Sequence, residues 1–166
     1  MLHIISHGEF SWGHPEASGI ELAGDEILTL SDIANEVDLP ENCLVTLSAC
    51  EVGLNEYQTL PEESYGLPAA FLSSGANRVV SALWPVSDIA TKQLMNYFYE
   101  HLSKGQSASK ALQKAQLQMR QGYLGEQTQD EFDVRWGDHH VTAGSSASNG
   151  KQEVHPFFWA AFICFA

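Results

Sequence analysis

Two residues whose side chains could cooperate in covalent catalysis each follow a short apolar run. Cys50 comes directly after the segment Cys43–Ala49, and His7 comes directly after Leu2–Ser6. A cysteine thiolate attacks carbonyl carbons, and an imidazole can move the protons that such an attack requires. Both runs have the composition of strands that are buried on both faces. Because parallel strands end at the same edge of a sheet, we expect the thiol and the imidazole to lie side by side there.

Each of these residues also has a plainer interpretation. A lone cysteine is most often a small buried hydrophobic residue, and a lone histidine often has a structural role. His3 and His14 lie near His7 in the sequence, and spacing alone does not choose among the three. Gly8 favours His7, because a glycine lets the backbone approach a substrate closely and its N–H can donate to an oxyanion.

The elements that must position these residues alternate between strands and helices. Besides the two runs above, we expect strands at Asn77–Trp84 and Phe157–Phe165, and a hairpin that joins Gly19–Leu22 to Ile27–Leu28. The segments with helical signals are 29–37 with an acidic capping box of Thr29 and Asp32, 65–74 ending at Gly75, 87–102, and a helix after Ser107. This alternation predicts an α/β fold with a mostly parallel sheet.

The remaining stretches predict loops. Glu9–Ser18 and Glu51–Glu63 are polar and aperiodic, and residues 122–153 are rich in Gly, Ser, Gln and Asp. We expect 122–153 to be a flexible insertion within a single domain that fills the 166 residues.

Composition excludes several classes of protein. The net charge is −13, from 21 acids against 8 bases, which argues against direct contact with nucleic acid. No apolar run is long enough for a membrane span, and no signal peptide precedes the first strand. Three cysteines without close pairs do not make a disulfide framework, so a cytoplasmic location is expected, with Cys43 and Cys164 in the core.

No cofactor or metal is expected. Neither a phosphate-binding loop nor a dinucleotide fingerprint is present, which leaves little support for a small-molecule hydrolase or thiol transferase. His139, His140 and His155 have no further ligand at a spacing typical of zinc sites.

Four blocks of sequence together resemble a known family. They are Ile4–Gly8, Leu47–Gly53, Val80–Asp88 and His155–Phe162, and Gly66–Ala76 between them fits the same pattern. In this order and spacing the chain resembles the CHAT domain, a caspase-like module found with tetratricopeptide repeats. The resemblance covers essentially the whole chain.

The resemblance implies a caspase–haemoglobinase-like three-layer sandwich and a cysteine endopeptidase with His7 and Cys50 as its catalytic dyad. It also implies an oxyanion hole made by the amides of Gly8 and Cys50, and no third residue that orients the imidazole. The family pattern begins with further strands before the His7 strand, so we expect residues 1–166 to be the C-terminal part of a CHAT domain. A protein substrate and a tetratricopeptide-repeat region, in the same or a partner chain, are the implied partners.

Substrate preference is a separate question. Asp88 could cap the helix that follows it, a role that Ser87 could share, or it could line a pocket for a basic P1 side chain, as the equivalent stretch of separases implies. Glu51, and Glu56, Glu62 and Glu63 after it, would add negative potential there. The alternative function is a non-catalytic scaffold or regulatory module of the same fold.

Overall fold

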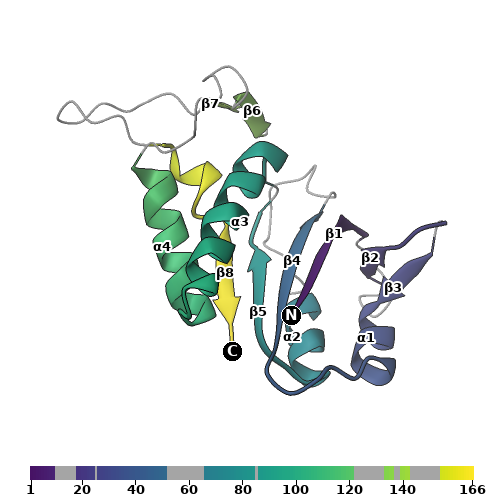
Figure 1. Cartoon of the computed structure of the whole chain (residues 1–166). Helices are drawn as coiled ribbons and strands as arrows, with labels where there is room; N and C mark the ends of the chain where they lie inside the picture. The colour runs from purple at the N-terminus through teal and green to yellow at the C-terminus, as the bar shows by residue number, and fades with distance from the viewer. Residues whose placement is uncertain are drawn as a thin grey trace. The chain divides into compact units, whose positions relative to one another are not determined.

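The computed structural model describes residues 1–9, 18–24, 26–51, 66–84, 86–121, 133–136, 139–142 and 154–166. The chain forms two compact units, Met1–Pro85 with Cys164–Ala166, and Val86–Ile163 (Figure 1). The strands are β1 Leu2–Glu9, β2 Gly19–Glu21, β3 Ile27–Thr29, β4 Cys43–Glu51, β5 Ala76–Ala82, β6 Asp133–Trp136, β7 His139–Thr142 and β8 Phe162–Phe165. The helices are α1 Leu30–Glu36, α2 Gly66–Ser73, α3 Asp88–Ser103, α4 Ala108–Arg120 and the short 3-10 helix η4 Pro156–Phe158.

The main sheet is mixed, with a parallel centre. Its strand order is β3-β2-β1-β4-β5-β8. β4 pairs in parallel with β1 on one side and with β5 on the other, whereas β2 pairs antiparallel with both β1 and β3. The predicted α/β class and the predicted hairpin are therefore confirmed, and the hairpin contributes the antiparallel part of the sheet.

β1 and β4 both run further than their apolar segments. His7, Gly8 and Cys50 lie near the carboxyl ends of these strands, as expected, but Glu9 and Glu51 also belong to the strands, so the expectation that loops begin at these two residues is wrong. The reason is that pairing, and not side-chain polarity, sets where a strand ends. Gly8 has a register partner on each side, Ile20 in β2 and Glu51 in β4.

The core of the first unit lies on one face of the sheet. Alternate residues of the strands contact the buried faces of α1 and α2 there, because successive side chains of a strand point to opposite faces. The buried members are Ile20, Ile33, Cys43, Val45, Leu47, Ala70, Phe71, Ala76 and Val79. The Ser74 hydroxyl ties the two helices together, since it donates to the carbonyl of Ile33 at 2.5 Å and to that of Ala70 at 2.8 Å.

The start of α1 and the end of α2 have the capping residues that the sequence predicts. Thr29 is the N-cap of α1, and its hydroxyl accepts from the Asp32 N–H at 3.1 Å while the Asp32 carboxylate accepts from the Thr29 N–H at 3.0 Å. This is the expected capping box. After α2, Gly75 has a φ of 99°, which is the left-handed conformation expected at a helix C-terminus.

In the second unit, α3 and α4 pack against each other. Nε2 of His101 on α3 lies 2.8 Å from Oε1 of Gln118 on α4, and the Gln116 amide donates to the carbonyl of Phe162 at 2.8 Å. The buried side chains of the two helices are Ala90, Leu94, Met95, Phe98, Ala111, Leu112, Ala115 and Met119. Their spacing is that of the amphipathic helices predicted from the sequence.

The prediction of a continuous strand over Phe157–Phe165 is wrong. η4 occupies its beginning and only β8 is extended. Pro156 favours the first turn of a helix, and Nδ1 of His155 accepts from the N–H of Phe157 at 3.2 Å. The rings of Phe157 and Phe158 then meet edge to face at 5.3 Å, so local capping and packing outweigh strand propensity.

Residues 122–153 contain one described element, the antiparallel hairpin of β6 and β7. The sequence analysis did not identify it, since four-residue strands beside glycine- and serine-rich segments give little periodic signal. The other residues of this insertion lie outside the described residues, and its flexibility remains a prediction.

Candidate active site

His7 and Cys50 occupy matched positions on neighbouring strands. The parallel register of β1 and β4 pairs His3 with Thr46, Ile5 with Ser48 and His7 with Cys50. Adjacent strands lie about 4.8 Å apart, and paired positions share a face of the sheet. The two residues that the sequence singled out are therefore next to each other in the backbone of the sheet, close to the carboxyl ends of both strands.

The face that carries these positions is open at β1. Leu2 and Ile4 pack toward the core, whereas Ile5 and His7 alternate with them and are exposed. The Ile5 side chain is 77% exposed. The candidate site thus lies on the face opposite the core formed with α1 and α2, and this face is exposed at Ile5 and His7.

The register also chooses among the histidines. His3 lies four residues before His7 on β1, and its Nε2 is 2.9 Å from the Ser48 hydroxyl oxygen. Partial burial lowers the pKa of His3 below its ordinary value of 6.5, because burial disfavours the charged imidazolium. His3 is therefore a neutral partner of Ser48, and His14 lies outside the described residues.

Ser48 is a feature of the site that the sequence analysis missed. It precedes Cys50 by two residues, so the period of a strand places both positions on one face. That alternation could have identified Ser48, but its hydrogen bond to His3 depends on the register of two strands that are far apart in sequence. Thr46, which precedes Ser48 by two residues and so lies on the same face of β4, is fully buried.

β4 extends past its pairing with β5. Its register with β5 runs from Cys43 to Leu47, which is opposite Ser81, while its register with β1 continues to Glu51. Alternate residues of a strand turn their N–H groups to opposite sides. Among the described residues, the last four residues of β4, 48–51, therefore have no register partner in β5.

The residues predicted to support the dyad are placed as follows. Gly8 is buried in β1, beside His7 and opposite Glu51, so these three residues and Cys50 form one cluster of backbone positions. Asp88 is the first residue of α3, in the second unit, and is exposed. Ser87, and not Asp88, occupies the N-cap position, without a capping hydrogen bond from its side chain. Glu56, Glu62 and Glu63 lie outside the described residues.

The comparison with protein families decides the identity of this fold. The model of the CHAT domain matches residues 1–166, the whole chain. This chain belongs to the CHAT domain family. CHAT domains belong to the caspase-like clan of cysteine peptidases, in agreement with the α/β sheet and with the resemblance noted in the sequence.

One relative of this CHAT domain is the human protein "Tetratricopeptide repeat protein 28". The two are 34% identical over 89 residues, which is 54% of this chain and 3% of that protein. The chain therefore spans a small part of the curated relative that it matches. The name of that relative agrees with the expected association between CHAT domains and tetratricopeptide repeats.

Other side chains of the CHAT domain bear on its chemistry. Cys43 is buried in the core, as predicted, whereas Cys164 is only half-buried, and neither is part of a disulfide. Within the described residues, no group of three or more His, Cys, Asp or Glu side chains could hold a metal ion. The described helices include none with the length and apolar character needed to cross a membrane.

Proposed function

We propose that this CHAT domain is a cysteine endopeptidase in which Cys50 is the nucleophile and His7 is the general acid and base. The observation that carries this proposal is the register of β1 and β4, which pairs His7 with Cys50. Membership of a caspase-like clan supports it, because that clan contains cysteine peptidases. The open face at Ile5 and His7 is consistent with a macromolecular substrate.

The reaction follows from these two side chains. The Cys50 thiolate attacks the carbonyl carbon of the scissile peptide bond, and the carbonyl oxygen takes up the negative charge. His7 gives its proton to the departing amine as the tetrahedral intermediate collapses to an acyl-enzyme. Water, deprotonated by His7, then hydrolyses the thioester and restores the thiol.

The negative charge on the substrate oxygen requires donors that are already in place. We assign this role to the amides of Gly8 and Cys50. Their backbone positions lie beside the dyad, and β4 continues past its pairing with β5 at this point. Removal of one such donor typically lowers kcat by about 10²–10³-fold in other hydrolases.

A basic P1 residue is the preferred substrate feature in this proposal. Glu51 ends β4 one residue after Cys50, and Asp88 begins α3. A carboxylate accepts two hydrogen bonds from an arginine side chain, which gives geometric selectivity as well as affinity. Glu51, one residue from Cys50, would supply a carboxylate of the S1 pocket.

Tetratricopeptide repeats are the proposed route by which the substrate is recruited. The human relative carries these repeats in its name, and the segment that matches this chain covers only 3% of that protein. A repeat region, in the same or a partner chain, would bind the protein substrate and present one of its segments to Cys50.

Covalent labelling tests the proposal. The protein that carries residues 1–166 is treated with an acyloxymethyl ketone probe with Arg at P1, and separately with the same probe with Asp at P1. Peptide mass spectrometry then locates the adduct, with Cys43 and Cys164, neither of which is part of a disulfide, as internal controls. We expect labelling at Cys50 by the Arg probe, and its loss in His7→Ala.

The other outcomes are equally informative. Labelling of Cys50 by the Asp probe alone would keep the dyad and overturn the basic pocket. Equal labelling of all three cysteines would show ordinary thiol reactivity without a catalytic site. A folded protein that forms no adduct, with a tetratricopeptide-repeat region supplied, would favour the non-catalytic scaffold.

A further inference from the structure

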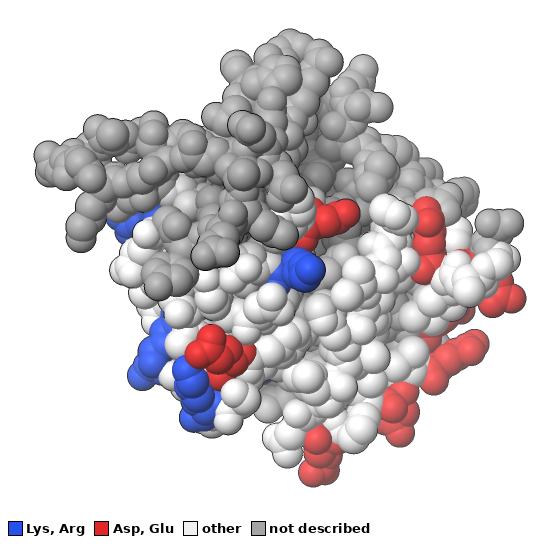
Figure 2. All heavy atoms as spheres, turned by 45° about the horizontal axis from the view of Figure 1, so that its top comes forward, with Lys and Arg blue, Asp and Glu red and all other residues white. Residues whose placement is uncertain are grey.

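Most of the net negative charge lies in the first unit, which holds 13 acids against one base, whereas residues 86–163 hold 8 acids against 7 bases. The described side chains of the first unit include six acids against one base, namely Glu21, Glu26, Asp32, Glu36, Asp38 and Glu41 against Arg78. Those of the second unit include five bases against two acids, namely Lys92, Lys104, Lys110, Lys114 and Arg120 against Asp88 and Glu100. Figure 2 shows the blue side chains gathered over the helices and most of the red ones over the sheet unit. Within an acidic chain, the segment 86–121 that contains α3 and α4 therefore has an excess of bases.

The basic surface is one face of α4. This helix contains no acidic residue, and its buried residues leave the opposite face to solvent. The exposed residues on that face recur at helical spacing; they are Lys110, Gln113, Lys114, Leu117, Arg120 and Gln121. Leu117 is 45% exposed in their midst. We call this set the α4 stripe.

The lysines of the α4 stripe are available to a partner. Lys104, just before α4, is already bound to Glu100 on α3, with its Nζ 2.5 Å from the carboxylate. Neither Lys110 nor Lys114 has an ion pair or a side-chain hydrogen bond within the described residues. The outer face of α4 therefore presents two positive charges, those of Lys110 and Lys114, which lie about one helical turn apart.

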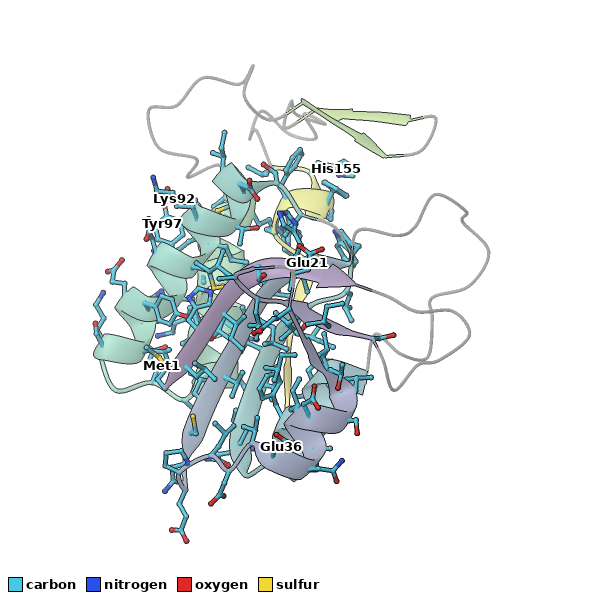
Figure 3. The ribbon with its side chains drawn as sticks, turned by 90° about the vertical axis from the view of Figure 1, so that its right-hand side faces the viewer. Met1, Glu21, Glu36, Lys92, Tyr97 and His155 are labelled. Carbon is cyan, nitrogen blue, oxygen red and sulfur yellow. The ribbon has the colours of Figure 1, made fainter. Side chains whose placement is uncertain are left out.

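The acidic surface of matching chemistry is the tip of the β2–β3 hairpin. The Leu22 N–H donates to the Glu26 carbonyl at 2.7 Å and closes the turn, and the Ser6 hydroxyl donates to the carbonyl of Glu21 at 2.6 Å. The side chains of Glu21, Leu22 and Glu26 are all exposed, and Leu22 is 46% exposed. Glu21 is labelled in Figure 3, where its place on the hairpin can be followed. We call these three residues the hairpin tip.

The two surfaces are complementary in charge and similar in layout. Each has one exposed leucine among side chains of a single sign, and these leucines are two of the four exposed large hydrophobic residues among the described ones. We propose that the hairpin tip of one copy of this chain docks on the α4 stripe of a second copy. Leu22 would meet Leu117, while Glu21 and Glu26 would face Lys110 and Lys114.

A second copy fits better than an unrelated anion. A second copy would bring an apolar side chain to Leu117 together with acids that face Lys110 and Lys114, and these local contacts would act against the repulsion between two chains of net charge −13. The contact joins different surfaces of the two copies, so it is head-to-tail and either continues as an open chain or closes as a ring. It is also small, so the association should be weak, transient and sensitive to salt.

The experiment is sedimentation velocity over a range of protein concentrations, in the Cys50→Ala background. That background separates the outcome from the proposed peptidase, because association requires no thiol. We expect weak self-association at about 50 mM salt that falls by about tenfold or more at about 500 mM salt, since screening shortens the range of the charges.

Charge reversal supplies the decisive comparison. Lys110→Glu with Lys114→Glu makes both surfaces acidic, and Glu21→Lys with Glu26→Lys makes both basic, so each double variant should be monomeric. An equimolar mixture of the two should associate again, because each variant then meets a surface of opposite charge. Glu36→Lys with Glu41→Lys, a reversal of the same size on exposed residues outside the hairpin tip, should associate like the parent.

Three results would overturn the proposal. A parent chain that stays monomeric at every concentration excludes this contact, and leaves an acidic segment of another protein as the candidate for the α4 stripe. Failure of the mixture to associate shows that the two surfaces do not meet. An equal effect of the control reversal shows that net charge, and not the hairpin tip, controls association.

Discussion

His7 and Cys50 are register partners on adjacent parallel strands, whereas His3, on the same face of β1, is paired with Thr46. This relationship distinguishes two histidines that are equivalent by composition. It also places the candidate dyad on the face of the sheet away from the α1 and α2 core, so substitutions there leave the main packing of the first unit intact. Effects on reactivity can therefore be separated from effects on stability.

The first prediction concerns the choice of histidine. His7→Ala should slow the labelling of Cys50 by about 10²-fold or more, because a positioned acid–base group contributes about 10²–10⁴-fold. His3→Ala should leave the labelling rate within a few-fold of the parent, because four residues of strand separate His3 from His7 by about 13 Å. The measurement is the second-order rate of adduct formation, with circular dichroism as the check on folding. Equal losses in the two variants would contradict the assignment of His7.

The second prediction is a pH dependence of stability that His3 causes. The pKa of His3 is lowered in the folded state by burial, so the unfolded chain binds this proton first as the pH falls. The free energy of unfolding should therefore decrease as the pH drops below about 6.5, and this contribution should be fully present at higher pH. Urea titrations at a series of pH values measure the slope.

His3→Gln is the matched variant for this slope. Glutamine can still hydrogen-bond to Ser48, but it does not titrate. The other six histidines are unchanged, so their contribution is common to both proteins. The parent should show the steeper loss between about pH 7 and about pH 5. Identical slopes would mean that His3 is protonated as easily in the folded chain as in the unfolded one.

The parts of the fold that could be predicted from sequence are those that neighbouring residues determine. The capping box of Thr29 and Asp32, the left-handed Gly75 and the two amphipathic helices all depend on residues within a few positions of one another. The parallel centre followed from apolar runs separated by helical segments. These signals are local, and the structure confirms them.

Features that depend on pairing between distant segments could not be predicted. The ends of β1 and β4 are set by partners in β2 and in each other, so Glu9 and Glu51, which were expected to begin loops, belong to the strands. The bond between His3 and Ser48 joins residues 45 positions apart. The edge-to-face packing of Phe157 and Phe158, together with the His155 cap, turned the start of an apparent strand into η4. Gly8 and the family resemblance favoured His7 from the sequence, and the register adds that His7, and not His3, is paired with Cys50.

The third prediction tests the cap of α1. Thr29→Ala removes the hydroxyl that accepts from the Asp32 N–H and should lower the free energy of unfolding by about 1 kcal/mol. The control is Ser107→Ala, because Ser107 is the N-cap of α4 but makes no side-chain capping bond. It should cost clearly less. Chemical denaturation measures the free energy of unfolding of both variants. Equal losses would mean that the replacement of an N-cap residue by alanine, and not the loss of the capping hydrogen bond, is responsible.

The same cap has a signature at acid pH. The hydrogen bonds from Thr29 lower the pKa of Asp32 below its ordinary value of 3.8. The contribution of this carboxylate is therefore present above about pH 4 and is lost as the pH falls through its folded-state pKa. Thr29→Ala should differ most from the parent near neutral pH, and the two should converge in strong acid.

The last prediction separates two reasons why a position requires glycine. Gly75 has a φ of 99° and an added Cβ would lie 2.9 Å from the Leu39 carbonyl oxygen, whereas Gly24 has a φ of 83° with nothing within 4 Å of the same atom. Gly24→Ala should therefore cost only the backbone strain, about 1–2 kcal/mol, and Gly75→Ala should cost more. At Gly19 the backbone angle is ordinary, but the Cβ would lie 2.2 Å from the Leu28 carbonyl oxygen and force β2 away from β3. Gly19→Ala should be the most destabilising of the three, and urea denaturation should place them in the order Gly19, Gly75, Gly24. If Gly24→Ala were the most damaging, backbone conformation would matter more than close packing at these three positions.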